Sequence, residues 1–160
     1  MLASVSIARS AAECEHPAVA RACSIARTLD VVGEKWSLLV LREVALGTRR
    51  FAGIQEATGA PPAVLTDRLR SLVALGVLAT RDYREPGARL RQEYVLTEAG
   101  RDLQPVLTAL KDWGDRHLAG PAGPPVSTRH RGCGAEVHVQ LVCEAGHTPS
   151  GIRDVVADPV

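Results

Sequence analysis

Aromatic residues are scarce in this chain, where phenylalanine, tryptophan and tyrosine make up 3% of 160 residues. Its core must therefore be built mainly from leucine, valine and alanine. No apolar run is long enough to cross a bilayer, and the N-terminal segment lacks a basic stretch followed by a sustained apolar one. We therefore expect a cytoplasmic protein with no signal peptide and no membrane partner.

The net charge is also small: the formal charge at pH 7 is +1. The chain has no global basic field to attract nucleic acid, so any such attraction must be local. Enzyme signatures are also missing: we find no paired carboxylates, no nucleophile beside a base and no phosphate-binding glycine loop. These absences predict that the protein is not an enzyme.

Helical periodicity dominates the first half of the chain. Apolar residues recur at helical spacing in residues 23–32, 34–46 and 49–59, and glycines close these runs. A fourth helix is expected over residues 62–75, because Pro62 suits a first helical turn, where a missing N–H costs nothing. Its inward stripe consists of Leu65, Leu69, Leu72 and Val73.

Strand-like patterns follow in residues 77–83 and 92–97, and the turn residues Pro86 and Gly87 lie between them. We expect the next helix to begin at Thr97, because threonine is a common helix N-cap. A long helix is expected over residues 99–118, in which Pro105 should introduce a kink or mark the true beginning.

The three helices expected over residues 34–46, 49–59 and 62–75, the hairpin and the helix after it follow one another in the order of a winged helix-turn-helix. Helix 62–75 would be its reading helix and the hairpin its wing. Between residues 49 and 91, eight arginines stand against four acids, so this segment carries +4 in a chain of +1. Arginines at a hairpin tip have no core to pack against and can reach a phosphate or a minor groove. This pattern predicts double-stranded DNA as the partner; the alternative is an α+β domain with a solvated arginine face.

The candidate DNA-binding residues fall into three groups: a pair before the third helix, the exposed side of the reading helix, and the wing. Arginines suit phosphates and guanine, and a small apolar side chain can meet a thymine methyl. The candidates are Arg49 and Arg50; Ala63, Thr66, Asp67, Arg68 and Arg70; and Arg84, Arg89 and Arg91.

The chain resembles the HxlR-type winged-helix transcriptional regulators, relatives of the MarR class, over roughly residues 23–118. The resemblance rests on Cys23 before a helix and on GEKWSLLVLREVALGTRRF, LTDRLRSLVALGVL, YVLTEAGRDLQPVL and DWG in the family's order. It implies a homodimer whose terminal helices pair, with two recognition helices in successive major grooves of a pseudo-palindromic operator. The recognition helix begins Pro61, Pro62 and Ala63 where the family usually carries polar side chains, so DNA shape should contribute much of the specificity.

We accordingly expect a homodimeric repressor that responds to a small molecule or to a redox signal. The alternative is a protein-interaction module of the same fold that docks through its C-terminal extension. Cys23 is the redox candidate, because some members of the family carry a redox-sensing cysteine there; otherwise it is a small buried residue. Trp36, Tyr94 and Trp113 could line an effector pocket or serve in ordinary packing.

The C-terminal extension is rich in cysteine, histidine, glycine and valine. A His-x2-Cys pair and a Cys-x3-His pair are each close enough in sequence to chelate, which suits one structural zinc ion. A β-hairpin without metal is the alternative, because EVHVQLV alternates like a strand. The candidate ligands are His130, Cys133, Cys143 and His147, and His138 is a spare.

The expected fold class is therefore α+β and mainly α: a winged helix-turn-helix with a two-stranded wing, a long C-terminal dimerisation helix and a small C-terminal β appendage. The expected organisation is a mobile N-terminal segment, the winged-helix and dimerisation domain, a glycine- and proline-rich linker and the Cys/His extension. The corresponding ranges are 1–20, 21–118, 119–126 and 127–160.

Overall fold

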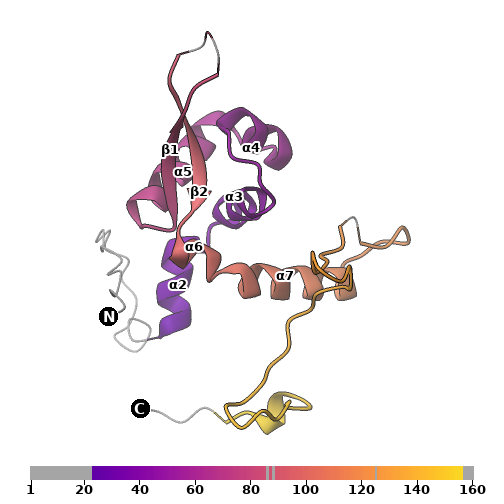
Figure 1. The fold of residues 1–160 in the computed structure, drawn as a ribbon. Coiled ribbons are helices and arrows are strands. Elements are labelled where there is room, and N and C mark those ends of the chain that lie inside the picture. The colour runs from indigo at the N-terminus through magenta and orange to yellow at the C-terminus, as the bar shows by residue number, and fades with distance from the viewer. Residues whose placement is uncertain (1–22, 86, 88, 125, 157–160) are drawn as a thin grey trace. The chain divides into compact units, whose positions relative to one another are not determined.

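A computed structural model describes residues 23–85, 87, 89–124 and 126–156 (Figure 1). The chain forms two compact units, one up to Gln104 and the other from Pro105 onward. The segment 1–20 lies outside the described residues. Within the described ranges, no helix is both long and apolar enough to cross a membrane.

Up to the end of the wing, the first unit has the predicted order of elements, and each bound lies close to the predicted one. The single helix expected over residues 99–118 is interrupted at residues 102–103. Four helices are followed by a two-stranded antiparallel sheet and a short helix, which confirms the mainly helical winged-helix fold. The elements are α2 (Ser24–Val32), α3 (Lys35–Ala45), α4 (Phe51–Thr58), α5 (Pro62–Ala74), β1 (Leu78–Tyr83), β2 (Arg91–Leu96) and α6 (Glu98–Arg101).

The core of this unit lies where α3 packs against α4 and α5. As predicted, α5 turns its leucine stripe inward, and α3 meets it with small aliphatic side chains. Gly59 ends α4 at φ +69°, a left-handed conformation that favours glycine, and its N–H donates to the Gln55 carbonyl at 2.8 Å. The completely buried side chains include Val40, Leu41, Ile54, Leu65 and Leu72.

The wing is the antiparallel pair β1–β2, whose register runs from Leu78 opposite Leu96 to Tyr83 opposite Arg91. Gly87, at φ +77°, lies in a turn between the strands, as predicted, and Pro86 lies outside the described residues. The segment before α4 is attached to β2, because the Arg49 carbonyl accepts the Tyr94 N–H at 2.8 Å. This bond holds the start of the helix-turn-helix against the wing.

Thr97 and Gly100 join the base of the wing to the end of α5. The Thr97 hydroxyl donates to the Gly76 carbonyl at 2.7 Å and accepts the Gly100 N–H at 3.1 Å, so the predicted helix start is confirmed. Gly100 is buried, and a Cβ atom there would lie 2.3 Å from the Val77 carbonyl oxygen. Only glycine therefore fits at this junction.

The second unit contains α7 (Gln104–His117, whose first residue belongs to the first unit) and the C-terminal segment. Pro105 marks the beginning of α7, which is one of the two outcomes expected for it. The predicted β appendage is reduced to one isolated antiparallel bridge, Arg129 to Glu136, and a 3-10 turn, η1 (Ile152–Asp154). Residues 137–142 form no strand because no partner strand lies beside them in the part of the chain that is described.

Candidate nucleic-acid interface

The exposed face of α5 carries most of the residues predicted to read bases. Ala63, Thr66, Asp67 and Arg70 are exposed, opposite the buried leucines. The Thr66 hydroxyl donates to the Pro62 carbonyl at 2.8 Å, so toward a base it offers its lone pairs and its methyl group. Arg70 lies 3.4 Å from Asp67, but so exposed a pair contributes at most about 1 kcal/mol and leaves Arg70 available to a base.

Arg68 lies apart from this set. Its side chain is only partly exposed, and its Nε atom is enclosed without a hydrogen-bond partner among the described residues. The residue stands on the flank of α5 and does not share the face of Thr66 and Arg70. Its predicted DNA contact would therefore be with the backbone beside the groove.

One face of the wing is organised by Glu93, which sequence reasoning missed. The register places Glu93 directly opposite Arg81, and Arg81 Nε donates to Glu93 Oε1 at 2.8 Å. Arg49 Nη1 lies 4.0 Å from the same oxygen. The buried carboxylate thus neutralises Arg81 and orients Arg49, and the matched positions of Arg81 and Glu93 in the hairpin were the available signal.

Arg50 is held against the same face of the wing. Its Nη1 atom lies 2.6 Å from Glu85 Oε1, and its guanidinium lies over the Tyr83 ring at 4.5 Å from the centroid. An open hollow of about 360 Å³ lies between the start of α4 and β2, lined by Thr48, Arg49, Arg50 and Glu93 among others. The predicted residues Arg49 and Arg50 therefore flank one concave surface.

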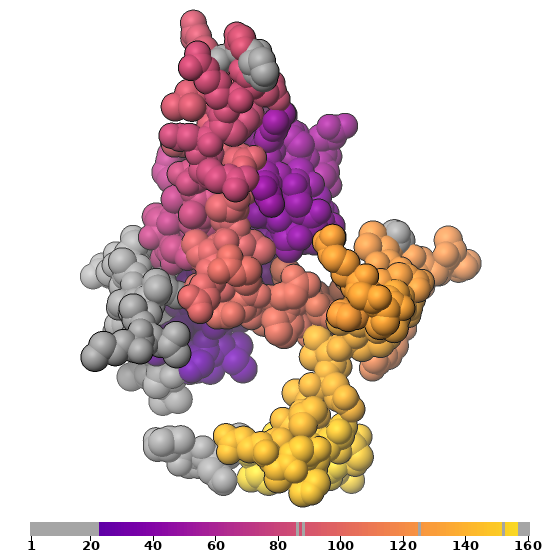
Figure 2. All heavy atoms as spheres, in the orientation of Figure 1, coloured from indigo at the N-terminus to yellow at the C-terminus, as the bar shows by residue number. Residues whose placement is uncertain are grey.

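Three of the predicted DNA-binding arginines lie at or near the wing tip. Arg84, Arg89 and Arg91 are all exposed. Arg89 and Arg91 form no ion pair with any residue in the described ranges. Figure 2 shows the wing extending beyond the helices of its own unit.

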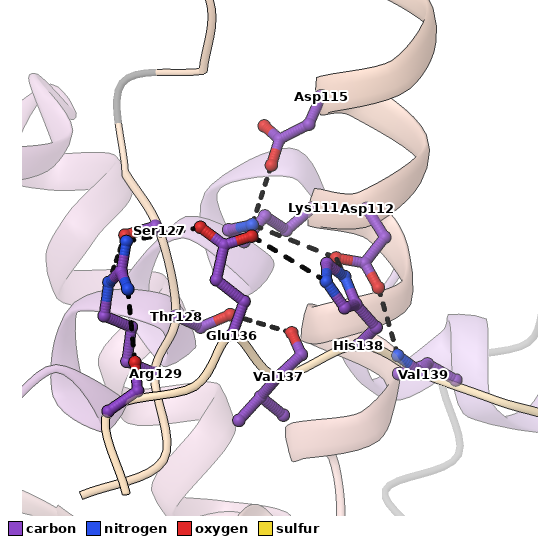
Figure 3. A network of polar contacts seen from close by, with 11 residues as sticks. Lys111, Asp112, Asp115, Ser127, Thr128, Arg129, Glu136, Val137, His138 and Val139 are labelled. Carbon is purple, nitrogen blue, oxygen red and sulfur yellow. Dashed lines mark hydrogen bonds and ion pairs between the residues drawn. The ribbon is translucent and has the colours of Figure 1, made fainter.

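In the second unit, a polar network fastens the segment after α7 to that helix (Figure 3). Asp112 accepts the Val139 N–H at 3.0 Å, and His138 Nδ1 lies 3.6 Å from the same carboxyl group. The Val139 hydrogen bond lowers the pKa of Asp112, so the carboxylate remains ionised at lower pH than an ordinary aspartate does. Lys111 donates to Asp115 at 2.7 Å, and this bond raises the pKa of Lys111.

The four candidate metal ligands form two separate pairs. His130 Nδ1 lies 3.2 Å from Cys133 Sγ, and the His147 N–H donates to Cys143 Sγ at 3.3 Å. Within the described residues, no three metal-ligating side chains come together. Both cysteines are free thiols, and His138 is engaged with α7 instead.

The remaining candidates are mostly accessible. Cys23 is an exposed free thiol at the N-cap of α2, which does not fit the alternative of a small buried residue. Trp36 is partly buried, and the Lys35 ammonium lies over its ring, 4.6 Å from the ring centroid. Trp113 is exposed on α7, while Tyr94 is partly buried in β2.

Comparison with known proteins decides the family. The family model described as HxlR-like helix-turn-helix matches residues 31–121, which include the helix-turn-helix, the wing and α7. The chain belongs to the HxlR-like helix-turn-helix family. The resemblance found in the sequence is confirmed.

Individual relatives of this HxlR-type chain agree with that assignment. The uncharacterized HTH-type transcriptional regulator MT3179 of Mycobacterium tuberculosis is 41% identical over 136 residues, which cover 85% of both chains. The crystal structure of PA1607, a proposed transcription factor, superposes with a TM-score of 0.76 at 34% identity, covering 86% of this chain and 94% of that one. The reduced form of the redox regulator HypR gives a TM-score of 0.53 at 30% identity, with 59% and 92% covered.

These relatives are transcription regulators, which are not enzymes, and this HxlR-type chain is a transcription regulator of the same kind. Membership of a helix-turn-helix family also implies DNA binding. In this chain the helix-turn-helix is formed by α4 and α5, and the wing by β1 and β2.

Proposed function

We propose that this HxlR-type regulator is a homodimeric repressor that reads a pseudo-palindromic operator with α5 and grips the flanking DNA with its wing. The observation that most supports this proposal is that α5 and the wing each expose side chains suited to a different kind of DNA contact. Thr66 and Arg70 occupy the outward face of α5. Arg89 and Arg91, which form no ion pair with any described residue, occupy the wing. A protein-interaction module of the same fold has no need for such arginines at the wing.

Base reading in this proposal rests on few side chains. Arg70 can donate two hydrogen bonds to a guanine, and Ala63 can contact a thymine methyl group. Asp67 can accept from a cytosine amino group but would be repelled by a phosphate, so it restricts which sequences are tolerated. Because this inventory is short, sequence-dependent DNA shape supplies the remaining specificity.

Phosphate contacts are the role we propose for the arginines outside α5. Arg49 and Arg50 flank the hollow at the start of α4, where helix N–H groups also favour an anion. Arg84, Arg89 and Arg91 extend the basic surface along the wing, and Arg68 adds to it from the flank of α5. Phosphate contacts fix register and supply affinity that falls steeply with salt.

Dimerisation is proposed from apolar side chains that lack partners within the described chain. On α7, Val106, Leu110 and Trp113 recur at helical spacing and are exposed, Trp113 by 57% of its surface. On α2, Ile25 is 72% exposed although the helix is amphipathic. Each fully buried side chain of this kind contributes about 1.5–3 kcal/mol, so pairing of these helices between two chains would be favourable.

A redox response is proposed from Cys23. The thiol is exposed at the first turn of α2, one of the two helices assigned to the dimer interface, so its oxidation could change how the two chains pair. The similar protein HypR is described as a redox regulator and has been solved in reduced and oxidised forms. If this role is correct, oxidant should change operator affinity in the wild type and leave a Cys23→Ser variant unaffected; equal responses would remove Cys23 from the mechanism.

Mutations can distinguish the contribution of the wing to DNA affinity from that of α5. Arg91→Ala should weaken binding to operator and random DNA alike and reduce the salt slope by about one unit, because it removes one phosphate contact. Arg70→Ala should instead cost about 1–3 kcal/mol on the operator alone. Fluorescence anisotropy with both duplexes at several salt concentrations measures both effects.

Arg129→Ala is the matched control, since Arg129 is an exposed arginine of the C-terminal segment that pairs with Glu136. It should leave both affinities unchanged. If Arg70→Ala and Arg91→Ala affected operator and random DNA to the same extent, α5 would not be the reading helix.

A further inference from the structure

The segment after α7 has no apolar core. None of the described side chains from residue 126 to residue 156 is buried, although the segment contains several valines and a leucine. A segment of this size cannot bury enough apolar surface to order itself, and small domains in this position use metal ions or disulfides instead. The described cysteines of the segment are free thiols, so a disulfide does not fill this role.

The first Cys/His turn is already shaped as half of a metal site. Nδ1 of His130 and Sγ of Cys133 lie 3.2 Å apart, close to the roughly 3.5 Å that separates nitrogen and sulfur ligands on one tetrahedral zinc ion. The Cys133 main-chain N–H donates to Nδ1 at 3.3 Å, and zinc would replace this hydrogen bond, because Nδ1 has a single lone pair. Gly134, at φ +73°, closes the turn by donating to the His130 carbonyl at 2.8 Å.

The second turn repeats this construction with the ligand order reversed. The His147 main-chain N–H donates to Cys143 Sγ at 3.3 Å. Gly146, at φ +82°, donates to the Cys143 carbonyl at 2.8 Å. Two turns of the same kind, each with one thiol and one imidazole, therefore lie in one segment without a core.

We propose that these two turns close on a single structural Zn²⁺ ion held by His130, Cys133, Cys143 and His147 of one chain. Two thiolates and two neutral imidazoles form a set that suits tetrahedral zinc, whereas Ca²⁺ and Mg²⁺ require oxygen ligands. Both thiols lose their protons on binding, so the two thiolates neutralise the charge of the ion. All four positions are protein ligands, which makes the site structural and not catalytic.

The connection between the turns permits this closure. The turns are separate in the structure, and residues 134–142 must fold back to bring Cys143 and His147 to the first pair. Those residues form no strand, and they are attached to α7 through the Asp112 contacts of His138 and Val139. Ala135 and Val137 are bonded to His130 and Thr128, so closure has to come from residues 138–142, with loss of the Asp112 contacts. These five residues span at most about 17 Å when fully extended.

Metal content of the full-length chain, purified without an affinity tag, tests the proposal. We expect one zinc per chain, and we expect Co²⁺ substitution to give the visible absorption of a tetrahedral site with two sulfur ligands. Cys133→Ser and Cys143→Ser should each lower zinc affinity by at least tenfold, the effect of removing one ligand. His138→Gln and Cys23→Ser are the matched controls and should retain one zinc per chain.

Zinc well below one equivalent, or full zinc content in Cys133→Ser, would overturn the proposal. Half an equivalent per chain would place the site between two chains and would overturn it as well. If the serine variants are insoluble, chelator-treated wild type can be titrated with ZnCl₂ while amide exchange of residues 127–156 is followed. Protection should rise to saturation at one equivalent, and unchanged exchange would contradict the site whatever the outcome of DNA-binding experiments.

Discussion

Replacing Leu110 by aspartate should convert the protein into monomers and lower its affinity for a two-half-site operator by at least about 100-fold, or 2.8 kcal/mol. Leu110 lies between Val106 and Trp113 on the exposed stripe of α7 and is itself 50% exposed. A carboxylate at the centre of an apolar interface would lose its hydration without gaining a partner. A monomer then meets one half-site only. Light scattering after size-exclusion chromatography and anisotropy with the operator measure the two consequences.

Val156→Asp is the matched control for this change, because Val156 is an exposed valine near the end of the described chain and outside α7. It should leave both the mass in solution and the operator affinity unchanged. A Leu110→Asp protein that remained dimeric and bound the operator like the wild type would place the interface on another surface.

Gly100→Ala should lower the free energy of unfolding by about 3 kcal/mol, within the range of severe core changes. The new Cβ atom would lie 2.3 Å from the Val77 carbonyl oxygen, and this oxygen cannot move freely because it accepts the Thr97 N–H at 3.2 Å. Relief of the clash must shift α6 away from the end of α5. Denaturant unfolding followed by circular dichroism measures the loss.

Gly120→Ala provides the control for that experiment. A Cβ atom at Gly120 would meet nothing within 4 Å, and its φ angle is not left-handed, so the change should stay within about 0.5 kcal/mol of the wild type. Equal stability of Gly100→Ala and Gly120→Ala would contradict the close contact between Gly100 and the Val77 carbonyl oxygen.

The winged helix could be predicted because its signals are local. Pro62 fixed the first turn of α5, the leucine stripe fixed its inner face, and Thr97 supplied a helix cap that needs only its own neighbourhood. Alternation in residues 77–83 and 92–97 predicted two strands, since a hairpin pairs segments that are adjacent in sequence. Each of these features depends on residues a few positions apart.

Features that depend on distant partners were not predictable in the same way. Glu93 lies outside the segment whose charge was counted, and its pairing with Arg81 follows once the register of the hairpin is fixed. Residues 137–142 alternate like a strand, but alternation does not supply the neighbouring strand that hydrogen bonding requires. Likewise, the grouping of α7 with the C-terminal segment depends on the bond from Val139 to Asp112, which are 27 residues apart.

The charge count also treated unlike arginines as equal. Arg81 is paired with Glu93, Arg50 with Glu85, and the enclosed Nε of Arg68 distinguishes that residue from its exposed neighbours. The count therefore indicates a basic segment, whereas the ion pairs of the folded chain distinguish the arginines that we propose as DNA contacts from those that are already paired. Arg70, Arg89 and Arg91 are the side chains on which the account now depends most.

Protection of DNA by the full-length protein tests the central claim most directly. Nuclease footprinting on a fragment carrying the protein's own promoter, with random duplex as competitor, reports sequence preference and site length together. We predict a protected, pseudo-palindromic site of about two helical turns, bound by a dimer with an affinity that falls steeply with salt. No protection beyond that of random DNA, on this fragment and on a genomic library at low salt, would contradict the account of this protein as a sequence-specific regulator.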